Sequence, residues 1–418
     1  MSTEPSSDPP LLTEDVIFCV TDFLATTADF LAVSETCRTW RAPGQIAAYR
    51  DRTVTVSPND NRWLARHLCL GEFYPTQAGY VRTLKLTGPE DDTSFLEFNT
   101  VVDALRHFPN IHTLTIAHLS WRTEHLVTPR PTFPTLNHLI MHDVCLLEDV
   151  HHQQLFQPLA LKNSWASVQL GGELEVFDGA DKPSFSVAVE HLLVANEEGE
   201  PHWRLLDSLP TISAVKELEL VYYAADLYGP TKSLVLDNKD TLHTFVLDIS
   251  AAEPSNDPRG ISISFVKHAH KLKELTVVLP LYDFADIEFG FESPIFFTDL
   301  CDKLLEDVGL HLPPKVTILR IQFITLAFEN GGKWNVRKRM RLQWARLAAR
   351  LARHPTLRSV EINMTSWFKV EKEPGWPPEL LLEIGKDFEL FSIHYCFGTT
   401  LYTYKTLADA QNLFNLVC

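Results

Sequence analysis

One short hydrophobic pattern returns along most of the chain. Its core is an apolar residue, two variable residues, a leucine, one variable residue and an aliphatic residue, as in IHTLTI (111–116). This alternation predicts a β-strand with one buried and one exposed face. The pattern is found in nine segments: 80–88, 108–119, 133–144, 189–196, 215–223, 240–250, 270–280, 315–323 and 356–364.

The spacing of these segments predicts a repeat solenoid. The gaps between their leucine-like positions are 30, 25, 53, 26, 27, 30, 44 and 41 residues, and a weaker unit at 164–170 divides the gap of 53 into 29 and 24. Units of this length provide one strand and one returning segment per repeat, and the two longest later gaps predict insertions. Amphipathic stretches at 99–108 and 340–354 are predicted to be returning helices.

The first fifty residues have a helical period instead. We predict one helix capped by Thr13 and a second one that Pro43 and Gly44 end, with a short third turn after them. The two apolar stripes consist of Val16, Ile17, Val20, Phe23 and Leu24, and of Phe30, Val33, Cys37 and Trp40. A module this small buries too little surface to be stable alone, so it must pack against the rest of the chain or against another protein.

The segment LTEDVIFCVTDFLATTADFLAVSETCRTW (12–40) resembles an F-box. The F-box pattern begins Leu-Pro-x-Glu, continues with aliphatic residues at helical spacing, and closes on Val-Cys-Arg-x-Trp. The matching positions are Leu12, Val16, Ile17, Val20, Leu24, Asp29, Phe30, Leu31, Val33, Cys37, Arg38 and Trp40. Thr13, Asp15 and Thr36 depart from the pattern. Thr13 weakens the match most, because the family's proline at that position belongs to the loop that meets the adaptor.

The resemblance implies a non-catalytic substrate-recognition adaptor of a Skp–cullin–F-box ubiquitin ligase. The helical module would dock on the Skp adaptor, and through it on a cullin scaffold, while the repeats bind a protein substrate. Irregular leucine-rich repeats follow an F-box in many fungal proteins, which agrees with the repeat pattern seen here. The expected adaptor-binding residues are Leu12, Thr13, Val16, Ile17, Val20, Leu24, Leu31 and Trp40.

We therefore expect an α/β chain with four parts: a disordered tail (1–10), an F-box-like helical module (11–50), a linker strand and helix (51–79), and a leucine-rich-repeat-like solenoid of parallel strands with outer helices (80–418). In each repeat, the residue between the leucine and the aliphatic residue points to the exposed, concave strand face. Alternation alone then provides the candidate substrate-binding residues: Lys85, Thr115, Ile140, Glu219, Val246, Thr276, Arg320 and Glu361.

Charge and cysteine usage narrow the range of partners. The formal net charge of −17 repels phosphate backbones, so we expect no nucleic-acid partner. No apolar run approaches the roughly 18 residues that span a bilayer, and no membrane partner is expected. The seven cysteines are scattered without a C-x-x-C motif, which favours a reducing cytoplasm or nucleus over a disulfide framework or a zinc site.

Catalytic residues, cofactors and metals are not expected. The chain contains neither G-x-S-x-G nor a P-loop nor G-x-G-x-x-G. His138 and His142 share a face of one predicted strand but lie about 13 Å apart along it, too far to bind one ion.

The basic stretch WNVRKRMRLQWARLAARLARHP (334–355) has two interpretations. Its apolar stripe, Met340, Trp344, Leu347 and Leu351, fits an outer helix of the solenoid that packs on the sheet. A basic amphipathic helix could equally bind calmodulin, an anionic membrane or an acidic partner.

Two other functions stay open. The chain could be a leucine-rich-repeat interaction scaffold with no ligase role, in which residues 12–50 act only as an N-terminal cap. It could also be an enzyme of an unrecognised type, which would need a pocket with convergent polar groups.

Overall fold

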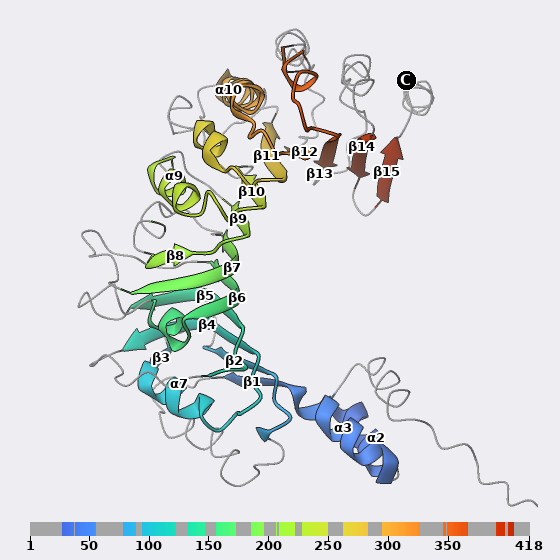
Figure 1. The fold of residues 1–418 in the computed structure, drawn as a ribbon. Coiled ribbons are helices and arrows are strands. Elements are labelled where there is room, and N and C mark those ends of the chain that lie inside the picture. Colours follow the sequence, from blue (N-terminus) through green and yellow to red (C-terminus); the bar gives the residue numbers. More distant parts are fainter. Residues whose placement is uncertain are drawn as a thin grey trace, which may run out of the picture. The chain divides into compact units, whose positions relative to one another are not determined.

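The described residues of the computed structural model form an α/β fold with an open, largely parallel sheet (Figure 1). They fall into two compact units: residues 1–148 with 157–162, and residues 149–156 with 163–418. The structure describes residues 27–36, 38–55, 78–88, 94–122, 133–146, 156–172, 185–195, 206, 209–221, 228–249, 262–282, 295–326, 346–347, 349–366, 390–397 and 400–404.

The first unit begins with two helices, α2 (Thr27–Thr36) and α3 (Arg38–Arg50), which pack against each other. α3 leads directly into β1, the first strand of a parallel sheet with the order β1-β2-β4-β5. β3 pairs with the far end of β4. The other elements are β1 (Asp51–Thr55), β2 (Thr83–Thr87), β3 (Ser94–Glu97), α7 (Phe98–Leu105), β4 (Thr113–Arg122), β5 (His138–Leu146) and the 3-10 helix η2 (Gln157–Leu161).

The second unit continues the same repeat with the strand order β6-β7-β9-β10-β11-β12-β13-β14-β15, and β8 pairs with β7. Among its described strands, only β15 runs antiparallel to its neighbour. Its strands are β6 (Ser164–Gly171), β7 (Ser186–Ala195), β8 (Thr211–Ser213), β9 (Glu217–Val221), β10 (Thr244–Asp248), β11 (Glu274–Tyr282), β12 (Ile318–Leu326), β13 (Ser359–Ser366), β14 (Leu390–Phe397) and β15 (Thr400–Tyr404). Its helices are α9 (Tyr228–Asp237), η5 (Ser264–His268) and α10 (Ile295–His311), which lie on one side of the strands (Figure 1).

Within each unit, equivalent positions of successive repeats lie side by side. In the second unit, Leu218 pairs with Phe245 and Phe245 pairs with Leu275, and all three are buried. The second aliphatic position behaves in the same way, as with Leu220 and Leu247. The alternation therefore builds one continuous apolar core on the helix side, where each fully buried side chain of this kind contributes roughly 1.5–3 kcal/mol.

Most of the predicted elements are present. Every predicted strand segment overlaps an observed strand, the weak unit at 164–170 included, and α7 falls within the first predicted helix apart from its first residue. Of the predicted helix at 340–354, residues 346–347 and 349–351 are described and helical. The sequence patterns did not predict β3, β8, α9, β14, β15 or α10, the last of which lies in the long gap between β11 and β12.

The prediction that Pro43 and Gly44 end a helix is wrong. One helix ends earlier, at Thr36, and α3 passes through both residues to Arg50. The reason is a tertiary contact: both residues are buried, and a Cβ atom at Gly44 would lie 2.7 Å from the Phe30 carbonyl oxygen of α2. Close packing of the two helices thus outweighs the low helix propensity of proline and glycine.

The basic stretch packs as an outer helix where it is described. Leu347 and Leu351 are each only 2% exposed. Arg350 extends along α10, with its guanidinium 3.6 Å from the Glu306 carboxylate. These contacts agree with the solenoid interpretation, while Met340 and Trp344 lie outside the described residues.

Candidate functional site

The helix pair carries the predicted adaptor-binding residues that the structure describes. Leu31 on α2 is 37% exposed, whereas Trp40 on α3 is half-buried. The other predicted residues lie outside the described part of the chain: Leu12, Thr13, Val16, Ile17, Val20 and Leu24. Leu31 is thus an exposed apolar side chain on the described helix pair, and its role in adaptor binding stays a prediction.

The predicted substrate-binding residues form one row in each unit, which we call the outward row. In the first unit, Lys85, Thr115 and Ile140 are register partners on adjacent strands. In the second unit, the row continues on five adjacent strands as Glu219, Val246, Thr276, Arg320 and Glu361. All of these side chains are exposed or half-buried, and each except Glu361 lies between two buried residues; for Glu361 the structure describes the buried residue before it, Val360. Their role in binding stays a prediction.

Arg320 is the centre of an ion-pair network on this face. Its Nη1 donates to Glu274 Oε2 on β11 and its Nε donates to Glu361 Oε2 on β13, both at 2.7 Å. Partial burial acts to lower the pKa of Arg320, but the hydrogen bonds and charges of the two carboxylates prevail and raise it. The network ties three successive strands together and holds the guanidinium in one orientation. The sequence patterns missed Glu274, because it is the register partner of Ile318 and lies outside the outward row.

Replacing Arg320 by methionine is expected to lower the free energy of unfolding by about 1 kcal/mol, because two carboxylates would then face each other without their shared cation. The side chains are 30% (Arg320), 35% (Glu274) and 24% (Glu361) exposed, and solvent screening keeps the effect small. Urea denaturation measures it. Lys216→Met is the matched control, because its pair with Glu190 is about half exposed. An equal loss in both variants would contradict a special role for the network.

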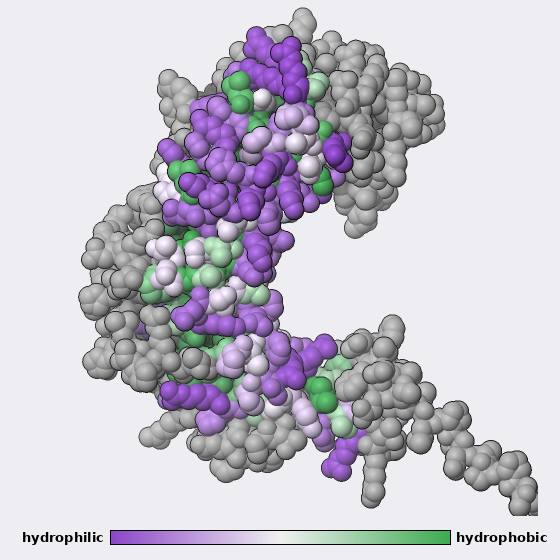
Figure 2. All heavy atoms as spheres, viewed as in Figure 1, coloured by the Kyte–Doolittle hydropathy of each residue, from purple (hydrophilic) through white to green (hydrophobic). Residues whose placement is uncertain are grey.

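A basic edge lies at the start of the strands in the second unit. His243 donates its backbone N–H to the Lys216 carbonyl, and Lys273 donates to the His243 carbonyl, at 2.7 and 2.8 Å. Burial lowers the pKa of His243, and the charges of Lys273, Lys271 and Lys216 lower it further. Figure 2 shows that hydrophilic residues cover much of the described, visible face of the second unit. Three lysines, Lys216, Lys271 and Lys273, lie near His243, and Lys216 also pairs with Glu190 at 3.0 Å.

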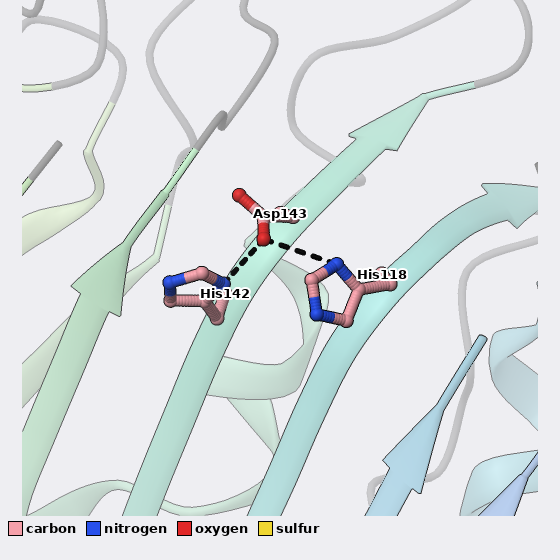
Figure 3. A group of neighbouring side chains, drawn as sticks. All are labelled: His118, His142 and Asp143. Atoms are coloured by element: carbon pink, nitrogen blue, oxygen red, sulfur yellow. Dashed lines mark ion pairs between the residues drawn. The ribbon is translucent and has the colours of Figure 1, made fainter. Parts of the chain in front are cut away.

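A second polar cluster lies on the first unit. Asp143 Oδ2 is 2.5 Å from His142 Nδ1 and 3.1 Å from His118 Nδ1 (Figure 3). The two imidazole rings meet edge to face, with centroids 5.7 Å apart. All three side chains are half-buried. The sequence patterns missed this cluster because they compared His142 with His138 on the same strand, whereas His118 comes from the preceding repeat.

Comparison of the chain with protein-family models and with curated proteins found no match. Among the described residues, none of the helices has the length and apolar character needed to cross a membrane. A function is therefore inferred from the fold, the helix pair and the polar groups of the strand face.

Proposed function

We propose that the protein is the substrate-recognition adaptor of a Skp–cullin–F-box ubiquitin ligase. The observation that carries the proposal is the position of α2 and α3. Their boundary falls between Thr36 and Arg38, inside the Cys-Arg-x-Trp block of the F-box-like sequence, and α3 leads directly into the repeat sheet. A helical module followed by parallel strands in tandem repeats is the arrangement that the resemblance to F-box proteins with leucine-rich repeats implies.

The proposed mechanism is proximity. The helical module binds the Skp adaptor, and the outward row of the repeats binds a protein substrate. Two simultaneous binding events raise the effective concentration of a substrate lysine near the ubiquitin-conjugating enzyme on the same scaffold. This role requires no nucleophile, metal or cofactor from the chain itself.

The strand face offers specific contacts for such a substrate. The Arg320 network presents a fixed guanidinium with a carboxylate on each side, and fixed polar groups restrict which partner groups can pair with them. The lysines of the basic edge, Lys216, Lys271 and Lys273, favour a substrate segment that carries acidic groups.

Purified Skp adaptor is expected to bind the full chain, and Leu31→Asp is expected to weaken this binding at least about tenfold, because a carboxylate would replace an exposed apolar contact. Isothermal titration calorimetry measures the change. Leu310→Asp is the matched control, because Leu310 is 53% exposed but lies on α10 in the second unit. Failure of the unmodified chain to bind, or an equal loss in both variants, would remove the support for an adaptor role.

A repeat scaffold without a ligase role is the second candidate. The observation that favours it is the covalent and hydrogen-bonded continuity between α3 and the sheet: the Arg82 backbone N–H donates to the carbonyl of Arg50, the last residue of α3, at 2.8 Å. A cap is expected to stabilise the first strands in this way. In that case the adaptor would not bind, while loosening the helix pair would still destabilise the first unit.

A further inference from the structure

We propose that His118, His142 and Asp143 form a binding site for a divalent transition-metal ion, with zinc as the ion that best fits the ligand set. The proposal is independent of the ligase role. It rests on the backbone that presents the three side chains, on the distances between their ligand atoms and on their chemistry.

The backbone breaks the strand alternation at this level. His118 and Asp143 have positive φ angles, 51° and 50°, and the register passes from Ala117–His142 directly to Leu119–Val144. In an uninterrupted strand, the residue after His142 would point into the core. The left-handed residue instead keeps the Asp143 side chain half-buried and returns Val144 to the core. A bulge at the same level of both strands therefore places the three side chains together.

The residue that follows β2 makes a close backbone contact with β4 at the level of the proposed site. Gly88 follows β2 at the level of His118, and its N–H donates to the Ala117 carbonyl at 3.0 Å. A Cβ atom on Gly88 would overlap the His118 carbonyl oxygen. The two backbones can approach this closely because residue 88 has no Cβ atom.

The ligand atoms are already close to the separations that zinc requires. One nitrogen of each imidazole and one Asp143 carboxylate oxygen all lie within 4.8 Å of one another. Ligands about 2.0–2.2 Å from a tetrahedral zinc lie roughly 3.4 Å apart. The His118–Asp143 separation of 3.1 Å is near this value, and the His142–Asp143 separation of 2.5 Å needs to open by only about 1 Å, which a side-chain rotation provides.

The chemistry of the three groups favours zinc over calcium or magnesium. Imidazole nitrogens suit zinc and other late transition metals, whereas calcium and magnesium prefer sites made entirely of oxygen ligands. Two imidazoles and one carboxylate leave a fourth tetrahedral position for water. Because His118 is on β4 and the other two ligands are on β5, the ion would join two adjacent repeats.

Zinc binding to the full chain tests the proposal. After exhaustive removal of metals, calorimetric titration with zinc chloride is expected to show one tight site per chain. His142→Ala and Asp143→Asn are each expected to raise its Kd at least about tenfold, since each removes a ligand. Asparagine tolerates a positive φ angle, so Asp143→Asn preserves the bulge while it removes the carboxylate.

The control is His138→Ala, which removes an exposed histidine from the same strand and is expected to leave the tight site unchanged. Cobalt(II) in place of zinc adds a spectroscopic readout, because its visible absorption reports the coordination geometry. Circular dichroism confirms that each variant is folded. Absence of a tight site, or equal affinity in His142→Ala, Asp143→Asn and His138→Ala, would overturn the proposal and leave a metal-free cluster in which one carboxylate pairs with two imidazoles.

Discussion

Replacing Asn238 by alanine is expected to lower the free energy of unfolding by about 2–5 kcal/mol, because it leaves buried backbone groups without partners. Asn238 lies just after α9 and is 2% exposed. Its Oδ1 accepts from the Val215 N–H at 3.0 Å, and its Nδ2 donates to the Ile212 carbonyl at 3.1 Å and to the Leu234 carbonyl at 2.9 Å. One side chain thus joins a helix to β8 and to the segment that connects β8 and β9.

Chemical denaturation measures the global effect of Asn238→Ala, and amide hydrogen exchange at Val215 measures the local one. The Val215 amide is expected to exchange faster in the variant. Asp237→Ala is the control: its side chain is exposed at the end of the same helix, and its removal is expected to change stability by less than about 0.5 kcal/mol. A similar loss in the two variants would show that the buried hydrogen bonds contribute little.

Replacing Gly44 by alanine is expected to destabilise the α2–α3 pair by about 1–3 kcal/mol, although alanine is the better helix former. The new Cβ would lie 2.7 Å from the Phe30 carbonyl oxygen and 2.8 and 2.9 Å from the Ser34 nitrogen and Cβ. Two of these are backbone atoms, so no side-chain rotation relieves the overlap and the helices must separate. If the pair docks on the Skp adaptor, adaptor binding weakens together with stability.

Gly229→Ala is the matched control for Gly44→Ala. Gly229 lies in the first turn of α9, and a Cβ there would meet no atom within 4 Å. Alanine at this position is expected to be neutral or to stabilise the chain by up to about 1 kcal/mol. Thermal unfolding distinguishes the two variants. A neutral Gly44→Ala would show that the helices accommodate a methyl group and that the close contact is not required.

The strands could be predicted because their signal is local and repeated. In each repeat a leucine-like residue and an aliphatic residue two positions later mark the buried face. Because this pair recurs along the chain, it also indicates which residues of successive strands lie side by side. The outward row followed directly from this alternation. Lys85 and Glu361 were placed on the exposed face from their own repeats alone, and the structure has them there.

The polar groups of the surface could not be predicted in this way, because they depend on contacts between repeats. Glu274 reaches Arg320 diagonally from a neighbouring strand. His118 and Asp143 meet only because both strands bulge at the same level, which alternation does not reveal. The helices show the same limit. The sequence around Gly44 predicts a helix end, and only the contact with Phe30 and Ser34 of α2 explains why glycine stands inside α3.

The unstaggered register of the outward row has a consequence for any extended peptide that would bind across it. Neighbouring strands lie about 4.8 Å apart, whereas an extended peptide advances about 3.3 Å per residue. A peptide laid at right angles to the strands therefore advances three of its residues for about every two repeats that it crosses. Successive side chains of an extended peptide point to opposite sides, so a side chain with the same orientation meets the row only at about every fourth strand. A recognition motif for this surface would therefore have a six-residue period.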